Sequence, residues 1–192
     1  MPAMKKLIAP AIMLILLSFL ISSCAGEDID DSNEDFNTKM LTTTITEADL
    51  IGHWNLSKII AKEPVDLNND GIFNTDLMLE TKCFNPMNII YNGNMTFESL
   101  NARMDFKAGE NNNLFFCMGN RTDKGTWSIS DDVLNLRVEV DGVVYNHTKD
   151  LIMDGNSFSF KVTKLESKKY VTDPGDTSVS SVTVVELEYK KV

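Results

Sequence analysis

The stretch Leu50-Ile51-Gly52-His53-Trp54-Asn55-Leu56-Ser57-Lys58-Ile59-Ile60 decides the fold. It carries a Gly-x-Trp motif, and its apolar residues alternate with polar ones in the period of two that is typical of a β-strand with one buried face. The alternation predicts that Trp54, Leu56 and Ile60 point toward a core, whereas His53 points away from it. A strand with one apolar face needs partners, so the remainder of the chain has to complete a sheet.

The chain after this strand consists of short alternating segments separated by turn residues. Strands are predicted at 88–91, 95–99, 103–107, 114–118, 124–129, 133–140, 143–153, 158–162 and 181–191, and in the last of these Val185, Leu187 and Tyr189 share one face. The pairs Asn92-Gly93 and Asp131-Asp132 are typical of hairpin turns.

These segments predict one all-β domain over residues 49–192. Consecutive antiparallel strands with one apolar face leave unpaired edges, and closing the sheet removes those edges. We therefore predict an antiparallel up-and-down β-barrel of about eight to ten strands, with one short helical insertion near residues 76–82 that Thr75 or Asp76 would cap. A two-layer β-sandwich is the competing architecture.

Residues 1–23 have the layout of a secretory signal peptide. Lys5 and Lys6 precede an apolar run at 7–21, which is shorter than the roughly 20 apolar residues of a membrane-spanning helix and contains Pro10. A membrane-spanning helix is the alternative. The run ends with Ile21-Ser22-Ser23-Cys24, which resembles the lipobox of bacterial lipoproteins. This resemblance implies cleavage before Cys24, lipidation of Cys24 and, because Ala rather than Asp follows it, a place in the outer membrane of the cell envelope, on either face.

Residues 24–48 are expected to form an acidic, disordered tether. Carboxylates crowd the positions between Glu27 and Asp35, and apolar residues are too sparse to offset the entropy of ordering the segment. The whole chain has a net charge of -10, and loss of the two signal-peptide lysines makes the mature chain more negative. This charge argues against nucleic acids and anionic membrane surfaces as partners.

Lipidation of Cys24 leaves Cys83 and Cys117 as an even pair. In an exported, oxidising setting this pair is expected to form a disulfide bond. On a chain-entropy argument, the bond closes a loop of about 35 residues and stabilises the domain by roughly 4 kcal/mol. Two buried free thiols are the alternative.

An oxygen-rich loop follows the first strand, at Asp66-Leu67-Asn68-Asn69-Asp70-Gly71-Ile72-Phe73-Asn74-Thr75-Asp76. Oxygen-bearing side chains at alternate positions, with a glycine at the sixth, suit a structural Ca²⁺ ion. The candidate ligands are five side chains and one backbone carbonyl: Asp66, Asn68, Asp70, Ile72, Asn74 and Asp76. Leu77 stands where a bidentate Glu is usual, so Asp76 or Glu80 would have to substitute. The alternative is a metal-free loop held by its own side-chain to backbone hydrogen bonds. No organic cofactor is expected.

In their order along the chain, these features resemble the lipocalin-like lipoproteins of Gram-negative bacteria. The resemblance covers Leu50 to about Phe160, and it is carried by Gly52-x-Trp54, the oxygen-rich loop, the cysteine pair and Gly125-Thr126-Trp127-Ser128. It implies a barrel of the calycin kind. Because that family is defined by its fold, the resemblance does not identify a cargo.

Two functions are compatible with such a barrel. In the first, a monomeric protein binds a small apolar or amphipathic ligand in a pocket lined by aromatic residues: Trp54, Tyr91, Phe97, Phe106, Trp127 and Phe160. In the second, the same residues fill the barrel, and the protein is a structural or interaction protein of the envelope with a protein or glycan partner. The size of the interior cavity distinguishes them. An enzyme is not expected, because the sequence shows no nucleophilic triad, phosphate-binding loop or metal-binding histidine pair.

Overall fold

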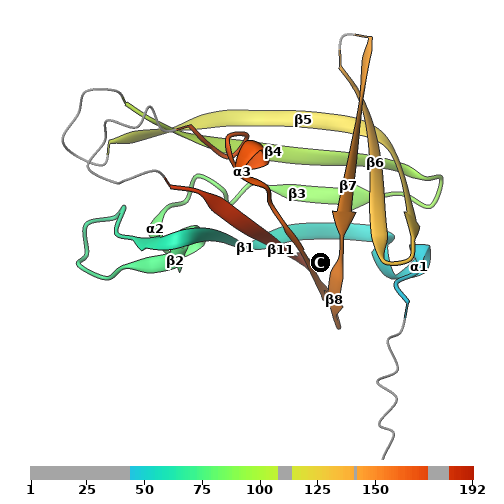
Figure 1. The fold of residues 1–192 in the computed structure, drawn as a ribbon, viewed down its shortest axis with the longest axis horizontal. Coiled ribbons are helices and arrows are strands. Elements are labelled where there is room, and N and C mark those ends of the chain that lie inside the picture. The colour runs from blue at the N-terminus through green and yellow to red at the C-terminus, as the bar shows by residue number, and fades with distance from the viewer. Residues whose placement is uncertain (1–43, 108–113, 141, 173–181) are drawn as a thin grey trace, which may run out of the picture. The chain divides into compact units, whose positions relative to one another are not determined.

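A computed structural model describes residues 44–107, 114–140, 142–172 and 182–192 (Figure 1). The chain divides into the units Met1–Met40 and Leu41–Val192, and all described residues belong to the second. The predicted signal peptide, Cys24 and most of the predicted tether therefore lie outside the described residues. Within the described ranges, no helix is both long and apolar enough to span a membrane.

The described elements are β-strands with a few four-residue helices. In chain order they are α1 (Glu47–Leu50), β1 (Gly52–Val65), β2 (Asn74–Asp76), α2 (Leu77–Glu80), β3 (Asn88–Tyr91), β4 (Thr96–Phe106), β5 (Phe115–Ser130), β6 (Val133–Val140), β7 (Val143–Asp150), β8 (Ile152–Asp154), β9 (Ser157–Lys161), α3 (Lys164–Ser167), β10 (Val171–Thr172) and β11 (Val184–Lys191). The predicted all-β class is confirmed.

The strands form one curled sheet, which is almost entirely antiparallel. Its strand order is β7-β6-β5-β4-β3-β1-β11-β9-β8, with β2 paired to β1 and β10 paired in parallel to β4. From β3 to β7 each strand pairs with the next one in the chain, as in an up-and-down barrel. The end strands β7 and β8 are separated only by Leu151, and the sheet curls around an interior (Figure 1). This curled sheet, rather than two flat layers, confirms the barrel-type prediction.

Both tryptophans of the Gly-x-Trp motifs lie in the interior, as predicted. Trp54 is 0% exposed and Trp127 is 3% exposed. Each indole nitrogen donates to a backbone carbonyl oxygen, that of Leu50 at 2.7 Å and that of Asn92 at 3.2 Å. Phe158 packs edge-on against the Trp54 ring with 4.8 Å between centroids, so the first strand and β9 share one core.

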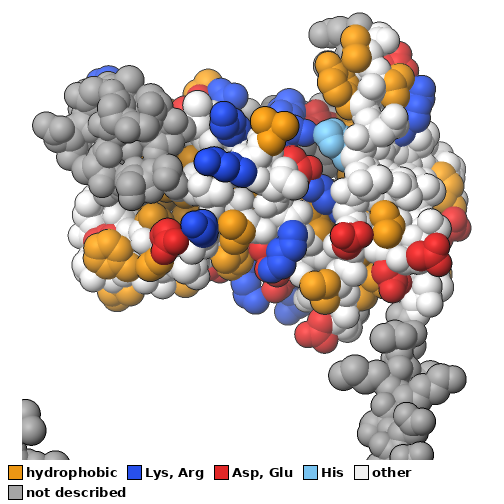
Figure 2. All heavy atoms as spheres, in the orientation of Figure 1, with side chains coloured by type: hydrophobic (Ala, Val, Ile, Leu, Met, Phe, Trp, Pro, Cys, Tyr) orange, Lys and Arg blue, Asp and Glu red, His pale blue; other side chains and the backbone are white. Residues whose placement is uncertain are grey.

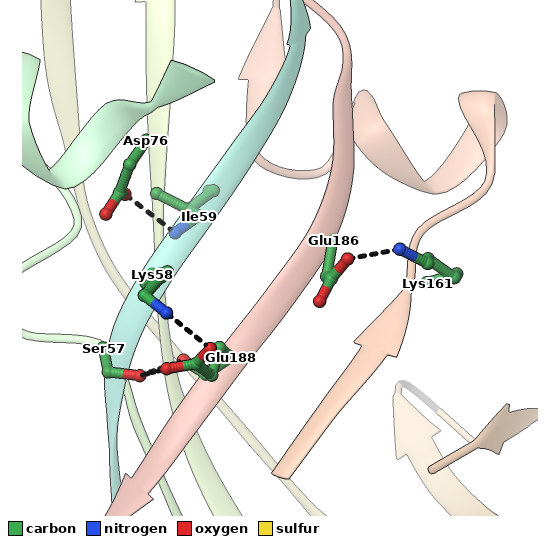
Figure 3. Close-up of polar contacts among 7 residues, drawn as sticks. All are labelled: Ser57, Lys58, Ile59, Asp76, Lys161, Glu186 and Glu188. Atoms are coloured by element: carbon green, nitrogen blue, oxygen red, sulfur yellow. Dashed lines mark hydrogen bonds and ion pairs between the residues drawn. The ribbon is translucent and has the colours of Figure 1, made fainter. Parts of the chain in front are cut away.

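A β-bulge at Ser57 changes which residues of β1 face the core. Ser57 is an extra residue in the pairing of β1 with β11, and its hydroxyl donates to the carbonyl oxygen of Glu188 at 3.0 Å (Figure 3). The backbone N–H of Ile59 donates to the Asp76 carboxylate at 3.3 Å. Beyond the bulge, Ile59 is fully buried and Ile60 is only partly buried. The prediction that Ile60 faces the core is wrong, because an extra residue reverses the alternation.

The first hairpin turn is longer than predicted. Instead of two residues at Asn92-Gly93, the turn runs to Met95, whose φ is 62° and whose N–H donates to the Asn92 carbonyl oxygen at 3.0 Å. The turn at Asp131-Asp132 agrees with the prediction, because both residues have a positive φ, 52° and 63°, as a tight hairpin turn requires.

Gly125 allows β5 to pass close to its neighbours. A Cβ atom at this position would lie 2.0 Å from the carbonyl oxygen of Arg137 on β6 and 3.0 Å from the ring of Phe97 on β4. Both distances are shorter than ordinary contacts, and the first involves backbone that cannot easily move. The glycine of the second Gly-x-Trp motif is therefore required by packing.

Cys83 and Cys117 form a disulfide bond, with their Cα atoms 5.1 Å apart. The bond connects the segment after α2 to the beginning of β5. Asp76 caps α2, because its carboxylate accepts from the N–H of Met78 at 3.0 Å. The predicted short helix, its cap and its covalent link to the sheet are thus all present.

The packed unit includes the last residues that the sequence assigned to the tether. Ile45 is 8% exposed, and its N–H donates to the Asp132 carboxylate at 2.6 Å. Thr46 caps α1 together with Asp49. Like α2 and α3, α1 has too few residues for a helical period to appear in the sequence.

Candidate ligand-binding cavity

The curled sheet holds a cavity of about 660 Å³. Side chains from β3, β4, β5, β6, β7, β9, β11 and α3 line it. Its volume falls in the range of roughly 300–1,000 Å³ that small-molecule sites occupy. A cavity of this size has room for a small molecule.

The strand register brings the lining residues together. Residues directly opposite each other on antiparallel strands point to the same face of the sheet. One such row crosses five strands from β3 to β7 and consists of Tyr91, Phe97, Gly125, Val138 and Tyr145. Because the first of these is 1% exposed, the row faces the interior, and Gly125 is the only member that adds no side chain to the cavity wall.

Aromatic residues form much of the apolar part of the wall. Tyr91, Phe97, Phe160 and Tyr189 are each less than 8% exposed. The rings of Phe160 and Tyr189 stack with 6.2 Å between centroids. Ile89, Leu136 and Val138 complete the apolar lining.

The six aromatic residues predicted to line the pocket divide into two groups. Three border the cavity: Tyr91, Phe97 and Phe160. The other three, Trp54, Phe106 and Trp127, are buried but do not border it. Trp127 lies 5.1 Å from Tyr91 between ring centroids, so it supports a lining residue from behind. The sequence pattern marks all six as interior, and it cannot separate the cavity wall from the packed core.

Arg121 belongs to the polar part of the cavity wall. Its guanidinium contacts the Asp123 carboxylate at 2.7 and 2.9 Å, and Asn101 donates to the same carboxylate at 3.1 Å. The hydrogen bond to Asp123 raises the pKa of Arg121. This pair was missed because polar residues in a strand interrupt the apolar alternation that predicts inward positions.

A second ion pair, which also borders the cavity, joins β7 to α3. The ammonium group of Lys149 lies 2.5 Å from the Glu166 carboxylate. Burial opposes ionisation of Glu166, but hydrogen bonds from Lys149 and Thr163 lower its pKa. The pKa of the neighbouring His147 is lowered by burial and by the charge of Lys169. His147 is therefore a neutral residue of the wall near neutral pH.

Three tyrosines, Tyr91, Tyr170 and Tyr189, are among the residues that line the cavity. Burial raises the pKa of all three, so they stay protonated and able to donate. Within the described part of the chain, the Tyr91 hydroxyl is buried without a hydrogen-bond partner. A buried polar group without a partner is destabilising.

The residues predicted to bind calcium lie between β1 and α2, with Asn74 and Asp76 in β2 and the others in the loop before it. Side-chain oxygens accept from backbone N–H groups within this loop at 2.8–3.1 Å, with acceptors at Asp66, Asn68 and Asp70. Of the remaining candidates, Ile72 is exposed, Asn74 donates to Glu80 at 2.6 Å, and Asp76 caps α2. Among the residues the structure describes, no three His, Cys, Asp or Glu side chains converge on one point. Calcium binding stays a prediction.

The family model described as lipocalin-like domain matches residues 50–191. No curated protein and no solved structure matches the chain. The matched range contains every residue that lines the cavity.

Proposed function

Because the chain belongs to the lipocalin-like domain family, we propose that it is a carrier that binds one small amphipathic molecule inside the curled sheet. The observation that supports this most directly is the cavity of about 660 Å³. Its wall is apolar and aromatic on one side and carries ion pairs and hydroxyl groups on the other. Such a wall suits a ligand with an apolar body and a polar end.

The alternative is an envelope protein with a filled interior and a partner on its outer surface. The cavity volume favours the carrier over this alternative. We propose binding and no catalysis. The reason is that the sequence shows no catalytic triad, in which a histidine acts with a nucleophile and a third orienting group, around either histidine of the domain.

We further propose that the carrier is held at the outer membrane by lipid on Cys24. The support is the signal-like segment and the lipobox resemblance at 21–24, both outside the described residues. A carrier of amphipathic molecules at a membrane surface would be close to a source of cargo. Replacing Cys24 with Ala is expected to abolish incorporation of labelled fatty acid and to reduce the membrane-bound fraction. An unchanged lipid label would contradict the assignment of Cys24.

Native mass spectrometry tests the carrier function. The protein is purified from its host under conditions in which detergent does not extract a bound ligand. Its mass is then compared before and after organic extraction. A mass excess that disappears on extraction, together with an identified amphipathic compound, is the expected result. A mass equal to that of the polypeptide, combined with no binding of any amphiphile added afterwards, would refute the carrier function.

A further inference from the structure

The curled sheet is open along one line. Its strand order begins with β7 and ends with β8. Within the described ranges, no backbone hydrogen bond joins β7 to β8, β9 or α3. Because β8 has only three residues and β7 has eight, backbone pairing does not close the sheet beside β7. We call the line along which β7 faces β9 and α3 the seam.

The cavity is bordered from both sides of the seam. Tyr145, His147 and Lys149 line it from β7, whereas Phe160 and Glu166 line it from β9 and α3. The lining residues of β3, β4, β9 and β11 are buried or half-buried, and the exposed ones belong to β5, β6, β7 and the turn after α3. A ligand that leaves the cavity sideways would therefore pass between β7 and α3.

Lys149 bridges the seam. Its ammonium group lies 2.5 Å from the Glu166 carboxylate and 5.3 Å from the centroid of the Phe160 ring. It also lies 3.5 Å from the carbonyl oxygen of Lys161 on β9. Among the described residues, every hydrogen bond, ion pair or ring contact that crosses the seam from β7 involves Lys149. This one side chain thus connects β7 to both elements opposite it.

The ion pair is mostly shielded from water. The side chains of Lys149 and Glu166 are 12% and 20% exposed. Charges that are largely removed from water attract each other more strongly than charges on an open surface. The pair is therefore suited to hold the seam closed, and breaking it would release β7 from α3.

Glu166 stays in place without Lys149. Its second carboxylate oxygen accepts from both the backbone N–H and the hydroxyl of Thr163, each at 3.0 Å, in the capping box of α3. The carboxylate is therefore fixed by its own helix, and the side of the seam that carries α3 keeps its geometry when the ion pair breaks.

The opposite side of the seam is the one that can move. β6 and β7 form a hairpin that projects beyond the other strands (Figure 1). Val143, Val144 and Tyr145 are 38–51% exposed, and Figure 2 shows hydrophobic side chains uncovered on the projecting end of this hairpin. Since these side chains are not packed away from solvent, they do little to fix β7.

We propose that the seam is the gate of the cavity and that the Lys149–Glu166 ion pair is the latch of this gate. The ligand enters and leaves sideways when the pair breaks and β7 moves away from α3. This inference rests on the proposed carrier function and names what controls access to its site. The latch is closed with or without ligand, so its removal populates the open form in both states. Entry and release should then both accelerate, while the dissociation constant stays unchanged.

The test measures how fast a neutral dye enters and leaves the cavity. The mature chain, residues 24–192, is exported as soluble protein with Cys24→Ala, which also removes the third cysteine, and is stripped of bound lipid. N-phenyl-1-naphthylamine and diphenylhexatriene are the probes, and stopped-flow fluorescence gives their rate constants. Because neither dye is charged, a change of charge at Lys149 does not alter binding through attraction to the dye.

Three single variants test the latch. Lys149→Met is expected to raise both rate constants about tenfold, the factor that a hydrogen bond between charged groups contributes to an equilibrium. Glu166→Gln should act in the same direction, because glutamine preserves the capping box but removes the charge. Lys161→Met is the matched control, since its ion pair with Glu186 joins β9 to β11 and does not cross the seam (Figure 3). It should leave both rates unchanged.

A covalent link tests the gate. Cysteines replace Lys149 and Glu166 together, and a short bismaleimide joins them. The joined protein should take up and release dye at least tenfold more slowly than the same variant before the reaction. In the control, cysteines replace Lys161 and Glu186, which are opposite each other on β9 and β11, and joining them should not slow the dye. Circular dichroism spectra that match the wild type establish that each variant is folded.

The outcomes separate this inference from the carrier function. Dye that binds the wild type but enters Lys149→Met and the joined protein at unchanged rates would overturn the gate while the carrier function stands. A weaker affinity of Lys149→Met with an unchanged entry rate would make Lys149 a ligand contact and would likewise overturn the latch. Absence of binding of both dyes to the wild type and to Lys149→Met at equilibrium would overturn both the gate and the carrier function.

Discussion

Replacing Tyr91 with Phe is expected to stabilise the ligand-free protein. The hydroxyl that is removed is buried and has no partner within the described residues, and an unsatisfied polar group of this kind costs about 1–3 kcal/mol. The ring is retained, and so are its contacts with Phe97 and Trp127, at 6.4 and 5.1 Å between centroids. Taking the lower figure of about 1 kcal/mol, the melting temperature should rise by about 2–4 °C for a domain of this size.

Calorimetric melting of lipid-stripped protein measures this effect. Tyr145→Phe is the matched control, because the Tyr145 side chain is 47% exposed and loss of its hydroxyl should leave the melting temperature unchanged. A lower melting temperature for the stripped Tyr91→Phe variant than for the wild type would show that the hydroxyl already has a partner, such as an ordered water, and would refute the reasoning.

Three other perturbations test the scaffold around the cavity. Replacing both Cys83 and Cys117 with Ala opens a loop with a sequence separation of 34 and should lower the free energy of unfolding by about 4 kcal/mol in urea denaturation; an unchanged midpoint would contradict this. Gly125→Ala places a Cβ atom 2.0 Å from backbone of β6 and should cost about 3 kcal/mol, whereas Gly93→Ala, whose Cβ would meet nothing nearer than 3.8 Å, should cost less than half as much. If the oxygen-rich loop binds calcium, the metal should raise the melting temperature of the wild type but not of Asp70→Ala, and identical curves with and without metal would discard the site.

In β3, β6, β9 and the part of β1 before its bulge, the alternation of apolar and polar residues predicts the inward face correctly. Trp54, Tyr91, Leu134 and Phe158 are examples, and each is at most 1% exposed. The physical reason is that successive side chains of a strand point to opposite faces, so one buried residue fixes the orientation of its neighbours. The class of fold and the position of both tryptophans follow from this rule alone.

The rule fails where a strand contains an extra residue. The bulge at Ser57 moves burial from Ile60 to Ile59, and a register shift in β11 has the same effect near its start. There Val184 is fully buried and Val185 is only partly buried, contrary to the prediction that Val185 shares the face of Leu187. A bulge depends on how two strands pair, and pairing partners separated by more than a hundred residues are not visible in the local pattern.

The cavity itself lies where the apolar pattern is interrupted. The sequence divides β5 into two predicted segments because of the polar stretch around Arg121 and Asp123, yet the structure shows one continuous strand, Phe115–Ser130. Both residues occupy inward positions, opposite Asn101 and Ser99 on β4. A polar residue at an inward position is costly in a packed core, so a run of them on adjacent strands indicates that the interior there is not packed core. The polar residues that interrupt the apolar alternation of β5 thus form the polar wall of the cavity. Polar residues at alternate, inward positions of a strand are the sequence pattern that indicates such a wall.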